Sequence, residues 1–363
     1  MKVLALASYP VEAACTRFRI SQFVGPLKEH GIDVTLRPLL NGRTFAELYR
    51  PAALPRTALA LVGAMLRRVE DLLKAHKFDA LFVQREAMLF GPPLVEWLAM
   101  RVSGCPMVLD LDDATYISYR SPTYGRLGSA LKWFGKTDDL IRWAQIVTCG
   151  NQSIAGHVTA QGKPAVVIPT VVDLDVFTPT AKSKPEEIPI LGWIGTHSTY
   201  PFLESIYPAL QQLARTHSFR LKVVGSGKQT IRIPGVDVES LSWNMEREVE
   251  DFRSFDVGLY PMLEDDWSVA KSGFKAIQYM AVGIPYVTTP VGTCAEIGEA
   301  GTTHLFAGDQ DEWSNALSSL LTDVSLRRRM GIAGRQHALQ NYGMQKQTEK
   351  LAQALRQACA MKV

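Results

Sequence analysis

Short hydrophobic runs alternate with longer segments of helical periodicity along nearly the whole chain. We expect strands in the first half at Val3–Ala7, Val34–Pro38, Ala80–Val83, Met107–Asp110, Ile146–Thr148 and Ala165–Ile168. The second half starts the pattern again, with strands expected at Ile190–Ile194, Leu221–Val224, Val257–Tyr260, Tyr286–Thr288 and His304–Phe306. Because strands that alternate with helices build βαβ units, the pattern predicts an α/β protein with parallel sheets.

Helical spacing fills the intervals between these strands. The predicted helices are Phe18–His30, Thr57–His76, Tyr200–Thr216, Asn244–Ser254, Phe274–Val282, Asp311–Thr322, Ser325–Asn341 and Met344–Cys359. Within the second of these, Leu59, Val62, Leu66, Val69 and Leu73 recur at steps of three and four residues. That spacing is typical of an amphipathic helix.

The length and one polar segment indicate two domains. The chain has 363 residues, whereas a single hydrophobic core stops growing at about 250–300 residues. Residues 179–187 are polar and bounded by prolines, which is typical of a linker. We expect an N-terminal Rossmann-like domain over 1–178 and a C-terminal one over 188–343. Doubly wound domains bind ligands at the carboxyl ends of their strands, so the ligands are expected in a central cleft.

Composition excludes several classes of protein. The chain carries 39 Lys+Arg against 36 Asp+Glu, and a net charge of +3 is too small to indicate nucleic-acid binding. Thr57–Leu66 is the longest stretch of the first half without a charge or a strong structure breaker, and it falls short of the roughly 20 residues that span a bilayer. The 5 cysteines are widely spaced, which favours reduced thiols over disulfides or a zinc site. Met1–Ala7 predicts a buried strand rather than a signal peptide.

The segment Trp267–Pro285 carries the strongest functional signal. Within it a Ser-Gly pair opens a helix that a Gly-Ile-Pro sequence ends. The N–H groups and the positive dipole end at such a helix start bind anions. Lys271 precedes the helix and Lys275 lies one turn into it, so both ammonium groups can reach a phosphate held there. Gln278 shares the face of Lys275. The alternative is a surface helix with two solvated lysines.

Motifs along nearly the whole chain resemble those of one enzyme family. The segments are Ile168–Pro179, Val223–Gly227, Phe255–Pro261, Lys271–Pro285 and Val291–Gly292 with Glu296. Their order and spacing resemble those of retaining GT-B glycosyltransferases, the group 1 or family 4 set. The resemblance implies two Rossmann-like domains that face a cleft. It also implies that a final helix, 344–363, crosses back to the N-terminal domain.

The resemblance also implies roles for residues on the donor side. Lys271 and Lys275 would contact the diphosphate in the catalytic step, with the amides of Ser272 and Gly273 beside them and Gln278 at the ribose. Further donor-side candidates are Gly195, Thr196, His197, Gly225 and Glu296.

Two features depart from the family pattern. The family has two glutamates eight positions apart, the second of which binds the ribose hydroxyls; Ala270 and Gln278 occupy these positions here. The family's Arg and Lys after the first strand of the second domain are replaced by Gly195–Thr199. The hydroxyls and amides of this loop would either line the donor phosphates or cap the helix expected at Tyr200. His197 is open to the same two interpretations, donor contact or structural histidine.

Polar residues at strand ends of the first domain are candidates for the acceptor side. Asp113 is the candidate that orients the acceptor hydroxyl, with Asp112 beside it; the alternative is a helix cap or a pair with Arg85. Arg85 could also bind an acceptor phosphate. Arg17 and Arg19 would read a substrate anion or be solvated charges at a helix start. The Asp-Leu-Asp sequence also matches the metal motif of the other glycosyltransferase fold, but that fold has a single domain. We therefore expect no metal and no other cofactor.

Basic residues mark the surface of two further segments. They are Arg56, Arg67, Arg68, Lys74 and Lys77 on the helix expected at 57–76, and Arg120, Arg126, Lys132, Lys136 and Arg142 among aromatic residues. Basic helices with aromatic residues either lie on anionic lipid or form a solvated face.

Together these observations predict a glycosyltransferase that moves a sugar from a nucleotide-sugar to the hydroxyl of a glycan, a lipid-linked molecule or another acceptor. The expected setting is bacterial cell-surface glycan biosynthesis, in the cytoplasm or peripherally on the cytoplasmic face of the membrane. Two alternatives remain open. One is a GT-B-type sugar-nucleotide epimerase, and the other is a catalytically silent nucleotide-sugar-binding module, for which Ala270 and Gln278 would reflect decay.

Overall fold

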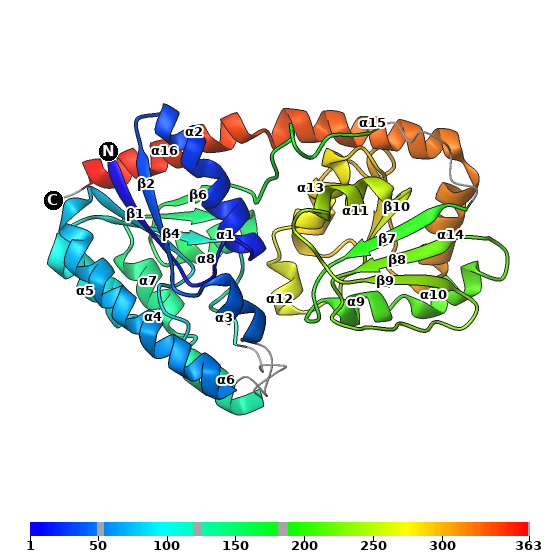
Figure 1. Cartoon of the computed structure of the whole chain (residues 1–363). Helices are drawn as coiled ribbons and strands as arrows, with labels where there is room; N and C mark the ends of the chain where they lie inside the picture. The colour runs from blue at the N-terminus through cyan, green and yellow to red at the C-terminus, as the bar shows by residue number, and fades with distance from the viewer. Residues whose placement is uncertain (49–53, 119–124, 181–187, 362–363) are drawn as a thin grey trace. The chain divides into compact units, whose positions relative to one another are not determined.

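The computed structural model describes residues 1–48, 54–118, 125–180 and 188–361. Contacts within the chain divide it into two compact units. Unit 1 comprises residues 1–170 together with 344–363, and unit 2 comprises residues 171–343. Each unit is a parallel sheet with helices on both faces (Figure 1).

The sheet of unit 1 has the order β2-β1-β3-β4-β5-β6, and all of its strand pairs are parallel. Its strands are β1 (Lys2–Ala7), β2 (Asp33–Pro38), β3 (Ala80–Gln84), β4 (Met107–Leu111), β5 (Ile146–Cys149) and β6 (Ala165–Val167). The predicted strands are confirmed to within a residue or two. The order reverses between β1 and β3, and such a reversal opens a crevice at the carboxyl ends of the two strands.

The first predicted helix of unit 1 is broken. In place of Phe18–His30 the chain forms α1 (Ala14–Arg19), a 3₁₀ turn at Ser21–Phe23 and α2 (Val24–Glu29). Pro26 lies in the first turn of α2, where its missing N–H costs no hydrogen bond; further into a helix it would break one. The other helices of unit 1 are α3 (Gly42–Glu47), α4 (Leu54–Lys74), α5 (Leu94–Ser103), α6 (Gly125–Lys132), α7 (Lys136–Trp143), α8 (Gln152–Ala160) and α16 (Met344–Ala360).

The long helix α4 buries two of its charged residues, Arg68 and Asp71. Arg68 is 2% exposed, donates hydrogen bonds to the carbonyls of Ala7, Arg37 and Ala87, and forms an ion pair of 2.9 Å with Asp71. Burial lowers the pKa of the Arg68 guanidinium. Arg68 therefore anchors α4 to the carboxyl edge of the sheet and is not one of the solvated charges that the sequence suggested.

The sheet of unit 2 has the order β12-β11-β10-β7-β8-β9 and is also entirely parallel. Its strands are β7 (Ile190–Ile194), β8 (Arg220–Val224), β9 (Asp237–Leu241), β10 (Val257–Tyr260), β11 (Tyr286–Thr288) and β12 (His304–Phe306). β9 was not among the predicted strands, because an edge strand that is only partly buried lacks the continuous hydrophobic run of a buried strand. The order reverses between β7 and β10.

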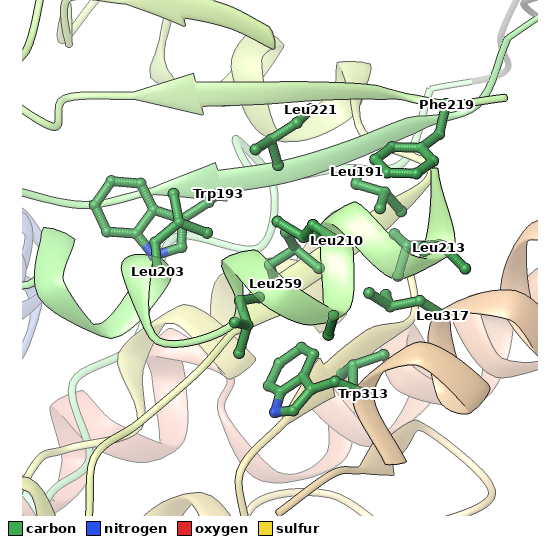
Figure 2. Packing of buried hydrophobic residues seen from close by; sticks show 14 of the residues in the cluster. Leu191, Trp193, Leu203, Leu210, Leu213, Phe219, Leu221, Leu259, Trp313 and Leu317 are labelled. Carbon is green, nitrogen blue, oxygen red and sulfur yellow. The ribbon is translucent and has the colours of Figure 1, made fainter. Parts of the chain in front are cut away.

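Helices on one face of this sheet enclose a hydrophobic core of unit 2 (Figure 2). Trp193 and Leu221 from the strands meet Leu210 of α10 (Tyr207–Leu213) and Trp313 of α14 (Gln310–Thr322). The helix predicted at 200–216 is divided into α9 (Tyr200–Glu204) and α10, because Pro208 occupies the first turn of a new helix. The remaining helices are α11 (Glu248–Ser254), α12 (Asp266–Val269), α13 (Phe274–Ala281) and α15 (Val324–Asn341).

The segment before the linker packs with unit 2. Arg253 donates to the carbonyls of Val176 and Thr178, and Arg335 donates to those of Leu174 and Phe177. These bonds place residues 171–178 with unit 2, whereas the sequence predicted that the N-terminal domain ends at residue 178. Of the expected linker 179–187, residues 181–187 lie outside the described part of the chain.

The C-terminal helix α16 belongs to unit 1. It packs against α2 and against β3, β4 and β5. Lys350 donates to the carbonyl of Val167, and Arg356 donates to that of His30. Among the described residues, no helix is long and apolar enough to cross a membrane.

Gly225 and Gly235 give a matched test of close packing in unit 2. Both have left-handed backbones, with φ of +82° and +81°, but a Cβ on Gly225 would lie 2.3 Å from the carbonyl oxygen of Gly195, whereas Gly235 faces open space. We expect Gly235→Ala to cost about 1 kcal/mol of unfolding free energy, and Gly225→Ala to cost about 1–3 kcal/mol more. Urea unfolding followed by tryptophan fluorescence measures both. Equal midpoints would contradict the close packing of the two loops.

Candidate functional site

The carboxyl edge of the unit 2 sheet brings the predicted donor-side segments together. β7 ends at Ile194 and β10 at Tyr260, and these strands flank the point where the strand order reverses. The loop after β7 leads into α9, and the loop after β10 leads through α12 into α13. This is the position at which doubly wound sheets bind ligands.

The start of α13 is shaped by a glycine. Gly273 has φ of +63°, and a Cβ there would lie 2.1 Å from Cδ1 of Ile297. The amides of Ser272 and Gly273 donate no hydrogen bond to any described residue. These amides lie at the positive end of the helix dipole. The geometry therefore provides unused N–H donors for an anion.

Lys275 places an unpaired ammonium group at this edge. Its Nζ lies 5.1 Å from the ring centroid of Tyr260, and within the described part of the chain no carboxylate forms an ion pair with it. Burial, and then the positive charge of Lys271, lowers the pKa of Lys275 to about 7. An anion bound here would supply a counter-charge and so oppose that shift.

Aromatic rings hold the second lysine. Nζ of Lys271 lies 3.3 Å from the ring centroid of Trp267 and 5.8 Å from that of Phe202, and the two rings lie 6.5 Å apart. This cation–π contact orients the ammonium group without neutralising it. No role was predicted for Trp267 from the sequence. Its position four residues before Lys271 is the sequence feature that could have indicated the contact.

Two polar side chains near the start of α13 are buried and lack partners. Gln278 is 3% exposed, and no described residue forms a hydrogen bond with its amide. Ser268 is fully buried, and its Oγ has no partner. Buried polar groups without partners cost free energy unless a ligand or water satisfies them. The ligand role that the sequence predicted for Gln278 stays a prediction.

The loop after β7 is fixed by its own hydroxyl groups. Thr199 Oγ1 accepts from the amide of Thr196 at 3.1 Å, and the Thr196 and Ser198 hydroxyls are 2.8 Å apart. Thr199 occupies the N-cap position of α9, but its side chain does not cap the helix. The alternative prediction, that the hydroxyl group of Thr199 caps the helix, is therefore wrong, because Thr199 makes no side-chain capping bond. Thr196 and His197 are exposed.

The remaining donor-side candidates lie on two other loops of unit 2. Gly225 and Gly195 approach so closely that only glycine fits at Gly225. Glu296 is exposed and follows the 3₁₀ turn Gly292–Ala295. On that turn Cys294 is buried and forms a hydrogen bond with Tyr260, next to Lys275. No sequence signal distinguished this cysteine from the other four free thiols.

In unit 1 an arginine and an aspartate form a rigid pair at the carboxyl edge of the sheet. Arg85 has φ of +59° and binds Asp112 through two hydrogen bonds of 2.5 and 2.7 Å. Gln84 donates to the same carboxylate, while its own Oε1 is buried without a partner. The Arg85 guanidinium lowers the pKa of Asp112 despite its burial. A left-handed backbone at a non-glycine residue is the kind of strain that collects at functional sites.

The other acceptor-side candidates differ in their availability. Asp113 is partly exposed and lies 3.8 Å from the guanidinium of Arg85. Arg17 stacks 4.4 Å from the ring centroid of Phe18. Arg19 is buried, with its donors on Asp110 and on the carbonyl of Ile168. Arg19 therefore connects the end of α1 to β4, and its charge is not presented to a substrate anion.

Arginines hold both aspartates of the Asp-Leu-Asp sequence. Asp110 pairs with Arg19, and Asp112 pairs with Arg85. Among the residues that the structure describes, no group of three His, Cys, Asp or Glu side chains could hold a metal ion.

Comparison with known proteins gives a family match for unit 2. Residues 189–323 match the family described as glycosyl transferases group 1. This segment contains β7 to β12 and both lysines of the α13 start. No curated protein matches the chain.

Solved structures match the chain over its whole length. A glycosyltransferase from Rickettsia africae has a TM-score of 0.70 at 12% identity and covers 98% of both chains. HepE of Anabaena in complex with UDP-glucose has a TM-score of 0.67 at 16% identity, over 98% of this chain and 100% of its own. The lipopolysaccharide outer core galactosyltransferase WaaB has a TM-score of 0.61 at 11% identity, over 98% and 99%.

These matches confirm the predicted architecture of two Rossmann-like parallel sheets. The family match covers the unit that holds the unpaired lysine, the unused amides and the buried glutamine. Residues 189–323 thus match the model of the group 1 glycosyl transferases, and the chain as a whole has the two-domain, Rossmann-like GT-B fold.

Proposed function

We propose that this enzyme transfers a sugar from a nucleotide-sugar donor to the hydroxyl group of a glycan or lipid-linked acceptor. The observation that carries the proposal is the partly buried Lys275, which has no carboxylate partner among the described residues, next in sequence to the unused amides of Ser272 and Gly273. A nucleoside diphosphate supplies the anion that this arrangement lacks. The complex of the structurally similar HepE with UDP-glucose supports the donor class.

The proposed mechanism stabilises the leaving diphosphate. As the bond between the sugar and the diphosphate breaks, negative charge grows on the phosphate oxygens. The ammonium groups of Lys271 and Lys275 and the amides at the start of α13 are oriented before the reaction, so they stabilise that charge without reorganisation. Trp267 holds Lys271 in place.

The other donor-side residues would bind the rest of the nucleotide-sugar. Gln278 is proposed to bind a ribose hydroxyl, since its buried amide can donate and accept. The loop of Gly195, Thr196 and His197 and the exposed Glu296 are proposed to contact the sugar and phosphates. A glutamine lacks the charge of the family's glutamate, so each of its hydrogen bonds to the ribose is weaker.

In unit 1 we propose Asp113 as the residue that orients the acceptor hydroxyl. It is the partly exposed carboxylate of the pair, while Asp112 is held by Arg85 and acts as its positioning partner. Arg17 is proposed to contact an acceptor anion. We further propose that the reaction retains the configuration of the sugar, needs no metal ion and belongs to cell-surface glycan synthesis. The similar fold of WaaB supports that last setting.

A panel of UDP-, GDP-, ADP- and dTDP-sugars tests the proposal, with products identified by mass spectrometry. Slow release of a nucleoside diphosphate and free sugar without acceptor, and transfer with acceptor, are expected. Formation of an isomeric nucleotide-sugar would identify an epimerase. Binding of a nucleotide-sugar without turnover would identify a silent binding module.

Replacing Lys275 tests the role of its charge. Lys275→Ala is expected to lower turnover by about 10²-fold or more, because one preorganised cation at the leaving group is lost. Arg328→Ala, an exposed charge on α15, is the matched control and should leave turnover unchanged. Initial rates at saturating donor measure the effect. Near-normal turnover of Lys275→Ala would remove the proposed role.

The lowered pKa of Lys275 gives anion binding a pH dependence. The ammonium form dominates below the pKa of about 7 and is lost above it, so affinity for an anion falls as pH rises. From pH 6 to pH 8 the charged fraction, and with it the affinity for sulfate, should fall about tenfold. Calorimetric titration measures this, with sulfate as a dianion of constant charge. Lys275→Arg keeps its charge and should flatten the profile; a similar slope in that variant would contradict the assignment.

The proposed reaction needs no metal ion, since lysines and amides neutralise the diphosphate. We expect transfer to continue in the presence of EDTA at rates within about twofold of the untreated enzyme. Loss of transfer on adding EDTA, with recovery on adding Mg²⁺ or Mn²⁺, would contradict metal independence. Sugar transfer itself would stand, because the panel of donors tests it separately.

A further inference from the structure

Helix α4 presents a hydrophobic face to solvent. Leu59, Val62, Leu66, Val69 and Leu73 are each more than half exposed, with Leu59 at 75% and Leu66 at 68%. They recur at steps of three and four residues, so they form one continuous stripe along the helix. From Leu59 to Leu73 the stripe is about 20 Å long at the rise of an α-helix. An amphipathic helix normally buries such a stripe, and this helix exposes it.

The opposite face of α4 fixes this orientation. Arg68 and Asp71 are buried, and Arg68 donates to three main-chain carbonyls of unit 1. Rotating the helix to bury Leu66 and Val69 would break these bonds and leave their carbonyls unpaired. The exposure of the stripe is therefore built into the packing of unit 1.

Helix α5 extends the hydrophobic surface. It packs against α4 (Figure 1) and exposes Leu94, Trp97, Leu98 and Val102. The guanidinium of Arg101 lies 5.6 Å from the ring centroid of Trp97. A tryptophan with an adjacent cation is the pair that membrane interfaces favour, because its apolar ring and polar N–H match the boundary between acyl chains and headgroups.

The charges around this surface are mainly positive. Arg56, Arg67, Lys74 and Lys77 are exposed on α4 and the turn that follows it. Asp71 of α4 and Glu96 of α5 are buried. The carboxylate of the exposed Glu70 is held by Lys74 and by Arg37. The border of the stripe therefore attracts anions and repels a second copy of itself.

We propose that the α4–α5 face, defined by the exposed apolar residues of these two helices, docks onto a bilayer that contains anionic phospholipid. The helices lie in the plane of the interface, with the apolar stripe among the acyl chains and the cations at the phosphate groups. The face also fits an enzyme whose acceptor is bound to a membrane lipid, although it stands independently of the proposed sugar transfer.

Vesicle flotation with the full-length enzyme tests this proposal. The protein should bind vesicles of phosphatidylglycerol and phosphatidylcholine at least about tenfold more tightly than vesicles of phosphatidylcholine alone. The double variant Leu66→Glu/Val69→Glu should lose at least about tenfold in binding. Both residues are exposed, so the melting temperature should not change. Ile332→Glu, an exposed apolar position on α15, is the control and should bind as the wild type does.

A charge variant separates lipid docking from simple hydrophobic adhesion. Arg56→Gln/Lys77→Gln keeps the stripe and removes two cations, so binding to anionic vesicles should fall about tenfold or more, and salt should weaken binding by the wild type. Equal binding to neutral and anionic vesicles would overturn the proposal. So would sedimentation showing a dimer that Leu66→Glu/Val69→Glu dissociates, because the occupant would then be a second copy.

Discussion

The chemistry of unit 2 depends on one unbalanced charge. The ammonium group of Lys275 lies over the ring of Tyr260, and no carboxylate among the described residues pairs with it. Keeping an ammonium group in such a place costs free energy, which is why its pKa falls to about 7. An ammonium group without a counter-ion does not stabilise the fold. Binding of an anion would make the charge favourable, so the arrangement is consistent with a site that a charged substrate completes.

The surrounding structure keeps this site open. Gly273 leaves room for Ile297 where any side chain would collide, and the amides of Ser272 and Gly273 donate to no described residue. The ring face of Trp267 contacts the ammonium group of Lys271. These contacts orient donors and cations while leaving their charges available, which is the condition for electrostatic stabilisation of a leaving group.

Buried charges serve a different purpose in unit 1. Arg19 and Arg68 each satisfy main-chain carbonyls and a carboxylate, so they position a loop and a helix. Arg85, whose own backbone is strained in the left-handed region, binds Asp112 at the carboxyl edge of the sheet. Arginine suits these roles because its planar group donates several hydrogen bonds at fixed angles. The hydrophobic face of α4 is exposed as a direct consequence of the Arg68 anchor.

The sequence alone determined the strands, their parallel arrangement and the lysine-containing segment before α13, because these features depend on local hydrophobic runs and on short spacings. It could not locate β9, whose residues have no continuous apolar pattern, or the breaks at Pro26 and Pro208. Only the tertiary structure decided which charges are buried. Arg19 and Arg68 resemble solvated residues in sequence, and their partners lie many positions away on other elements.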